Sequence, residues 1–149
     1  MSLKQADVKT AYKLQCDADY TYIDVRSIPE FEKGHPAGAY NVPLLNLDPR
    51  TGQMQPNPNF LAVMQANYAG DSKLLVGCQM GGRSTQAGQI LIAAGYQDVT
   101  NVVGGFGGAQ NRITGERNEG WVDAGLPVDR DTPTQNSYQA LQQRVITSD

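Results

Sequence analysis

Residues 76–85 read Val76-Gly77-Cys78-Gln79-Met80-Gly81-Gly82-Arg83-Ser84-Thr85, and this stretch decides how the chain is expected to fold. The apolar run at 74–76 that leads into it is typical of a buried strand. Beyond it, apolar residues recur at 87, 90, 91 and 94, the spacing of one helix face, and Gly95 supplies a helix stop. The sequence therefore predicts that Cys78 lies in a glycine-containing turn between a strand and a helix.

Such a turn is suited to an anionic sulfur. Glycine lets successive backbone N–H groups point inward, and a helix N-terminus adds unpaired N–H groups with a partial positive charge. Arg83 contributes a full positive charge. Because these dipoles favour a thiolate, Cys78 is predicted to be a reactive nucleophile. The alternative is that Cys78 is a small buried hydrophobe and that the glycines serve only the geometry of the turn.

Length and composition indicate an ordinary globular domain. The 149 residues are enough for one domain with a real core, and 40% hydrophobic with 18% charged residues is unexceptional. A net charge of −3 gives no reason to expect a nucleic-acid partner. No apolar run approaches a membrane span and residues 1–10 lack a signal-peptide core, so we expect a cytoplasmic protein with no membrane partner.

Cysteine and histidine are scarce. Two cysteines, Cys16 and Cys78, are too few for a disulfide framework, and a single histidine, His35, makes a cysteine–histidine metal site unexpected. We therefore expect no metal and no cofactor. Cys16 is interpreted as a packing residue, with a thiol that resolves a persulfide or disulfide at Cys78 as the alternative. His35, between Gly34 and Pro36, is interpreted as a structural histidine bonded to backbone, with a general base as the alternative.

The rest of the chain reads as short helices, strands and loops. We expect helices at 6–15 and 59–68, a helix start near Ser27, strands at 21–25 and 98–103, a loop at 46–57, a polar surface excursion at 110–120, and a short helix and stop from Trp121 to Val128. The glycine-rich segment 104–108 does not match the spacing of a dinucleotide-binding loop. The tail carries a capped amphipathic patch after Ser137, which would pack on its own domain or on a second copy.

Asp24 and Arg26 lie at the carboxyl end of the expected strand at 21–25. In an open α/β sheet, ligands bind beyond the carboxyl ends of the strands. The two residues are therefore candidates for holding the site together, with a surface ion pair as the alternative.

Several segments together resemble the rhodanese family of sulfurtransferases. They are Ile23-Asp24-Val25-Arg26 with Glu30-Phe31, Gly34–Pro43, Cys78–Ser84, and Asn101–Gly105 followed by Trp121 and Gly125–Val128. The resemblance covers about residues 20–128, so we expect a rhodanese-like domain at 1–130 and a C-terminal tail at 131–149 with helical character. One departure is that the segment between Gly105 and Trp121 is longer than the family's usual few residues.

The resemblance implies an α/β, three-layer fold, with a mainly parallel central sheet and helices on both faces. It also implies that Cys78 takes the outer sulfur of thiosulfate or of a persulfide donor and passes it to a thiophilic acceptor such as cyanide, or to an acceptor protein. The substrate-binding residues would be Gln79, Met80, Gly81, Gly82, Arg83, Ser84 and Arg26, with Asp24 supporting them. We expect the sulfur donor and acceptor to be small molecules, and we expect the protein to be a monomer or a homodimer.

The sequence also allows functions other than sulfur transfer to be considered. A cysteine-dependent phosphatase uses C-x5-R, with the arginine six positions after the cysteine, but here Ser84 stands at that position and Arg83 stands at the fifth. A loop one residue shorter suits a phosphoryl group poorly. A non-catalytic binding module would not need Cys78. A persulfide carrier that feeds a partner enzyme stays open, and the neutral Gln79 and Met80 leave the donor open as well.

Overall fold

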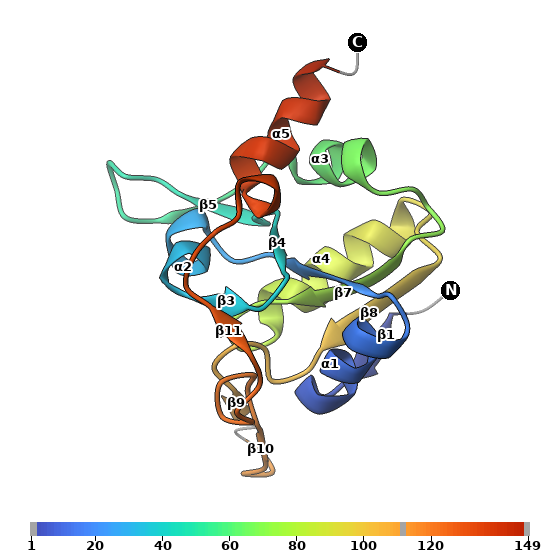
Figure 1. The fold of residues 1–149 in the computed structure, drawn as a ribbon. Coiled ribbons are helices and arrows are strands. Elements are labelled where there is room, and N and C mark those ends of the chain that lie inside the picture. Colours follow the sequence, from blue (N-terminus) through green and yellow to red (C-terminus); the bar gives the residue numbers. More distant parts are fainter. Residues whose placement is uncertain (1–2, 111–112, 148–149) are drawn as a thin grey trace.

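The computed structural model describes residues 3–110 and 113–147 and is built around one sheet (Figure 1). Its order is β1-β8-β7-β2-β4, and every neighbouring pair is parallel. The strands are β1 (Lys4–Ala6), β2 (Thr21–Asp24), β4 (Tyr40–Asn41), β7 (Lys73–Gly77) and β8 (Asp98–Val102). The helices are α1 (Val8–Asp17), α2 (Ile28–Lys33), α3 (Phe60–Asn67), α4 (Gly82–Ala93) and α5 (Tyr138–Thr147).

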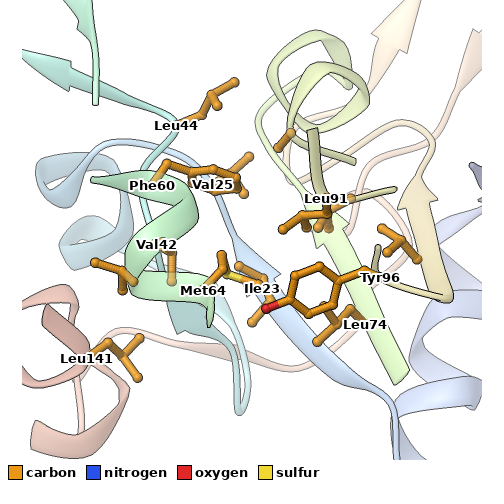
Figure 2. Packing of buried hydrophobic residues seen from close by; sticks show 14 of the residues in the cluster. Ile23, Val25, Val42, Leu44, Phe60, Met64, Leu74, Leu91, Tyr96 and Leu141 are labelled. Carbon is orange, nitrogen blue, oxygen red and sulfur yellow. The ribbon is translucent and has the colours of Figure 1, made fainter. Parts of the chain in front are cut away.

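Helices cover both faces of this sheet because alternate strand residues point to opposite sides. On one side, Ile23, Leu74 and Val76 pack in one core with residues of α3, α4 and α5. Figure 2 shows Ile23 and Leu74 in this core together with Met64, Leu91 and Leu141 from those helices. On the other side, Tyr22 and Leu75 pack against α1, α2 and the buried Trp121. The three-layer α/β fold and the mainly parallel sheet expected from the sequence are thus confirmed.

The first strand was not expected. The helix predicted at 6–15 begins only at Val8, after the N-cap Asp7 accepts the Thr10 N–H at 2.8 Å, and it runs to Asp17. Ala6 instead closes β1, which pairs with β8 so that Gln5 lies beside Asn101. Three mostly polar residues carry no strand signal of their own; pairing with β8 creates the strand.

The loop predicted at 46–57 is also wrong. β5 (Leu45–Leu47) and β6 (Met54–Pro56) form an antiparallel hairpin that projects from the body of the molecule (Figure 1). Its residues are mostly exposed, so they lack the apolar alternation by which a buried strand is recognised.

The chain after β8 also differs from expectation. Within the predicted excursion at 110–120, β9 (Ala109–Gln110) pairs with β10 (Arg117–Asn118), while residues 111–112 lie outside the described part. The short helix expected from Trp121 is wrong: residues 121–125 form consecutive turns. Gly125 and Pro127 leave too few residues for a helix there. The chain then reaches β11 (Val128–Asp129), which pairs with β3 (His35–Pro36).

The C-terminal tail packs on its own domain. After a 3₁₀ turn at Thr134–Asn136, α5 lies against α3. The Asn67 side chain donates to the Leu141 carbonyl at 2.9 Å, and Asn57 donates to the Tyr138 hydroxyl at 3.0 Å. Tyr138 and Leu141 are buried in the same core as Ile23, so α5 completes one helical layer.

Among the helices of the described residues, none is long and apolar enough to span a membrane.

Candidate active site

Cys78 lies between β7 and α4, as the sequence predicts, and its sulfur is held by the turn. Gly81 adopts a left-handed conformation at φ 108° as the N-cap of α4, and its N–H donates to Cys78 Sγ at 3.0 Å. Sγ also lies 3.4 Å from the Ser84 hydroxyl, and Cys78 is only 2% exposed. A backbone N–H aimed at sulfur, at the positive end of a helix, stabilises negative charge on that atom.

Arg83 is anchored rather than free. Its Nη1 and Nη2 donate to the Glu30 carboxylate at 2.7 and 3.0 Å, which fastens the Cys78 loop to α2. Burial raises the pKa of Glu30, but hydrogen bonds from Arg83 and Ser27 and the charge of Arg83 outweigh it and lower that pKa from 4.5 to about 2. The hydrogen bond to Glu30 in turn raises the pKa of Arg83, whose charge also interacts with Cys78.

Glu30 is a site residue that sequence reasoning did not single out. Its carboxylate accepts the Ser27 N–H at 3.1 Å and the Ser27 hydroxyl at 2.9 Å, and it forms a capping box at the start of α2. The Ser-x-x-Glu spacing of Ser27 and Glu30 was the available signal. That spacing predicts the helix start but cannot predict the contact with Arg83.

Asp24 and Arg26 form a buried pair behind the loop. Arg26 Nε and Nη2 both donate to Asp24, with Nη2–Oδ2 at 2.8 Å, and neither residue is more than 3% exposed. Arg26 also reaches the Gly34 carbonyl at 2.7 Å and Gln79 Oε1 at 3.3 Å. Its guanidinium stacks 4.3 Å from the ring centre of Phe106. This geometry rules out a surface ion pair, and it places the Arg26 guanidinium against Gln79 of the loop and the ring of Phe106.

The segment after β8 supports the loop from another side. The N–H groups of Phe106 and Gly107 donate to the carbonyls of Cys78 and Gln79 at 2.8 and 3.0 Å. Gly105 sits at φ 60°, and a Cβ there would collide with both of those carbonyl oxygens. The glycine-rich stretch 104–108 thus serves close backbone approach, a role that the sequence alone did not assign to it.

The other expected residues occupy different positions. Met80 is 66% exposed at the surface of the loop. His35 is buried, contacts the Phe31 carbonyl through Nδ1 at 2.8 Å and stacks on the Phe31 ring, which fits a structural role. Cys16 is exposed, so the expectation of a packing residue is wrong. It lies on α1, across the sheet from the layer that contains α4 and Cys78.

A cavity of about 480 Å³ borders the loop. It is lined by Ser27, Pro29, Glu30, Lys33, Leu45, Leu47, Met54 and Arg83, so the hairpin β5–β6 and α2 form its walls. Arg83 is the residue that this cavity shares with the Cys78 loop. In the part of the chain that the structure describes, no group of three His, Cys, Asp or Glu side chains could hold a metal ion.

Comparison with known proteins gives a consistent picture. Residues 7–112 match the rhodanese-like domain family. The chain is 36% identical over 111 residues to chloroplastic thiosulfate sulfurtransferase 16 of Arabidopsis thaliana, covering 74% of this chain and 81% of that protein. It is 37% identical over 102 residues to rhodanese-like domain-containing protein 17 of the same plant, covering 67% of this chain and 64% of that protein. A crystal structure of Rv0390 from M. tuberculosis has a similar fold, with a TM-score of 0.70 and 25% identity, covering 88% of this chain and 100% of that chain.

Proposed function

The chain belongs to the rhodanese-like family of sulfurtransferases, and on that premise we propose that it carries sulfane sulfur on Cys78 between a small donor and a thiophilic acceptor. The observation that carries the proposal is the position of Cys78 Sγ, 3.0 Å from the Gly81 N–H at the start of α4. A nucleophile that must exist as an anion, and then hold an anionic terminal sulfur, needs such a donor and needs neither a base nor a metal.

The reaction has two displacement steps. In the first, the Cys78 thiolate attacks the outer sulfur of thiosulfate; a new S–S bond forms, the bond to the sulfite sulfur breaks, and sulfite leaves with the electron pair. In the second, cyanide or another thiophilic acceptor attacks the terminal sulfur of the Cys78 persulfide and releases the Cys78 thiolate. Charge is conserved in both steps, and no oxidant or reductant is consumed.

Thiosulfate is the proposed donor because Arg83 places a positive charge beside the loop and because a relative bears the name thiosulfate sulfurtransferase. A persulfide donor uses the same step with a thiolate as leaving group. An acceptor protein in place of cyanide, a homodimer in place of a monomer, and the cytoplasmic location remain predictions from the sequence. A phosphatase is disfavoured because Arg83 stands at the fifth position after Cys78 and is tied to Glu30.

The test measures thiocyanate formed from thiosulfate and cyanide. Cys78→Ser should lose the activity, and Cys16→Ser, which removes an exposed thiol across the sheet, should keep it. Hydrolysis of an aryl phosphate should stay at background. Sulfur transfer by Cys78→Ser near the wild-type rate, or phosphatase activity that depends on Cys78, would contradict the proposal.

A further inference from the structure

A chain of hydrogen bonds leads from Cys78 through Ser84 and Asn101 to the edge strand β1. Ser84 Oγ lies 3.4 Å from Cys78 Sγ and donates to Asn101 Oδ1 at 2.6 Å. Asn101 Nδ2 donates to Gln5 Oε1 at 2.8 Å and to Thr85 Oγ1 at 3.2 Å. Ser84 and Asn101 are 0% and 3% exposed, so water does not substitute freely for these partners.

The direction of each hydrogen bond follows from counting donors and lone pairs. The Gly81 carbonyl accepts the Thr85 N–H at 3.1 Å and the Thr85 hydroxyl at 2.7 Å, so Thr85 alone supplies two donors to this oxygen. The Thr85 hydroxyl proton is therefore used, and its oxygen can only accept from the Asn101 amide. That contact fixes the amide with its oxygen toward Ser84.

The same count decides where the Ser84 proton goes. The Gly81 carbonyl lies 3.1 Å from Ser84 Oγ but already has two donors, whereas Asn101 Oδ1 is closer, at 2.6 Å. The hydroxyl proton therefore points to Asn101, and a Ser84 lone pair faces Cys78 Sγ. In this arrangement Ser84 accepts from a protonated sulfur and does not donate to an anionic one.

We propose that Asn101 is a positioning residue for Cys78: its amide oxygen competes with the Cys78 sulfur for the Ser84 proton and so restrains formation of the thiolate. The inference builds on the proposed role of Cys78 in sulfur transfer. Removing the amide oxygen leaves the Ser84 proton free to turn toward the sulfur, so loss of Asn101 makes Cys78 ionise more readily.

The test is the rate of iodoacetamide alkylation as a function of pH, in a Cys16→Ser background so that only Cys78 reacts. Asn101→Leu keeps the approximate shape of the side chain without its hydrogen bonds. Its alkylation midpoint should lie about one pH unit below that of the parent, the order expected for one hydrogen bond gained by an anion. In Ser84→Ala, the further change Asn101→Leu should produce no such shift, because no hydroxyl proton remains to be released.

The variants leave the other charged and titratable groups around Cys78 unsubstituted. They are Arg83 on α4, Glu30 on α2 behind it, Asp24 and Arg26 at the end of β2, and the buried hydroxyl of Tyr22. Thr100→Val is the matched control: Thr100 is buried on the same strand, and its side chain lies on the opposite face of the sheet. It should leave the midpoint unchanged.

An unchanged or raised midpoint in Asn101→Leu, or an equal fall with and without Ser84, would overturn the proposal. If Asn101→Leu does not fold, Asn101→Asp provides the same test with the opposite sign: a carboxylate is a stronger acceptor and should raise the midpoint, more with Ser84 than without it. An equal rise in both backgrounds would contradict the role of Asn101. Because alkylation needs no sulfur donor, the result stands whether or not the protein transfers sulfur.

Discussion

The guanidinium of Arg83 and the carboxylate of Glu30 meet through two hydrogen bonds, 2.7 and 3.0 Å long, although 53 positions separate the residues in the sequence. Paired nitrogens on paired oxygens fix the plane of the guanidinium as well as its position. The pair therefore holds the positive charge of Arg83 in one orientation, and it joins the Cys78 loop to α2 and to the neighbouring cavity.

Arg83→Ala should weaken the use of thiosulfate mainly through KM, by about ten- to hundredfold, the order expected for one charge-assisted contact with an anionic donor. Glu30→Gln is the matched variant, because it can retain a hydrogen bond to Arg83 while removing a negative charge, and it should lower KM. Steady-state kinetics with varied thiosulfate would measure both. An unchanged KM in Arg83→Ala would mean that its charge acts only on the structure.

The pKa of Glu30 gives the pH dependence of stability. Because the folded-state pKa of about 2 lies below the ordinary value of 4.5, the stabilisation is fully present above about pH 4.5 and is lost as the pH falls toward 2. The full difference would be about 3 kcal/mol, and solvent screening at this partly exposed pair reduces it to about 1–2 kcal/mol. Urea unfolding between about pH 6 and pH 2 should show a shallower loss of stability in Glu30→Gln than in the parent. If the free energy of unfolding fell equally steeply with pH in the parent and in Glu30→Gln, Glu30 would not be the source of this pH dependence.

The strand, turn and helix around Cys78 could be predicted because their signals are local: an apolar run, two glycines and a helical repeat. β1 and the hairpin β5–β6 could not be predicted, because these segments are short and their residues are mostly polar or exposed. They become strands only by pairing with another segment. The partners of Arg83 and of Ser84 likewise depend on distant segments. Glu30 reaches the loop from α2, and Asn101 reaches it from β8.

Asp24 and Arg26 should contribute to stability as a pair. Asp24→Asn leaves the Arg26 guanidinium buried without its counter-charge, which should cost about 3–5 kcal/mol in the free energy of unfolding. Glu119→Gln is the control, because its carboxylate pairs with Lys9 at 3.4 Å with both side chains largely exposed, and its loss should cost less than about 1 kcal/mol. If urea unfolding showed the same loss of free energy of unfolding in Asp24→Asn and Glu119→Gln, the stabilising role of the buried pair would be contradicted.

Gly105 should be needed for the shape of the loop. Gly105→Ala introduces a Cβ at φ 60° that collides with the carbonyls of Cys78 and Gln79, so the loop must shift. We expect sulfur transfer to fall by about ten- to hundredfold while the protein remains folded, since small displacements of reacting groups have effects of this size. Gly115→Ala is the control, because it has a similar φ of 76° but, among the described residues beyond its own chain neighbours, no atom lies within 4 Å of the added Cβ. An equal fall in the activity of Gly105→Ala and Gly115→Ala would show that backbone strain alone, and not the collision with the carbonyls, causes the loss.

The central claim is that Cys78 carries the transferred sulfur, and mass spectrometry of the protein after exposure to thiosulfate tests it most directly. We expect a gain of one sulfur atom, located on the peptide that contains Cys78, absent from the peptide that contains Cys16, and removed when cyanide is added. No added sulfur on Cys78, or sulfur found there that cyanide does not remove, would contradict the account.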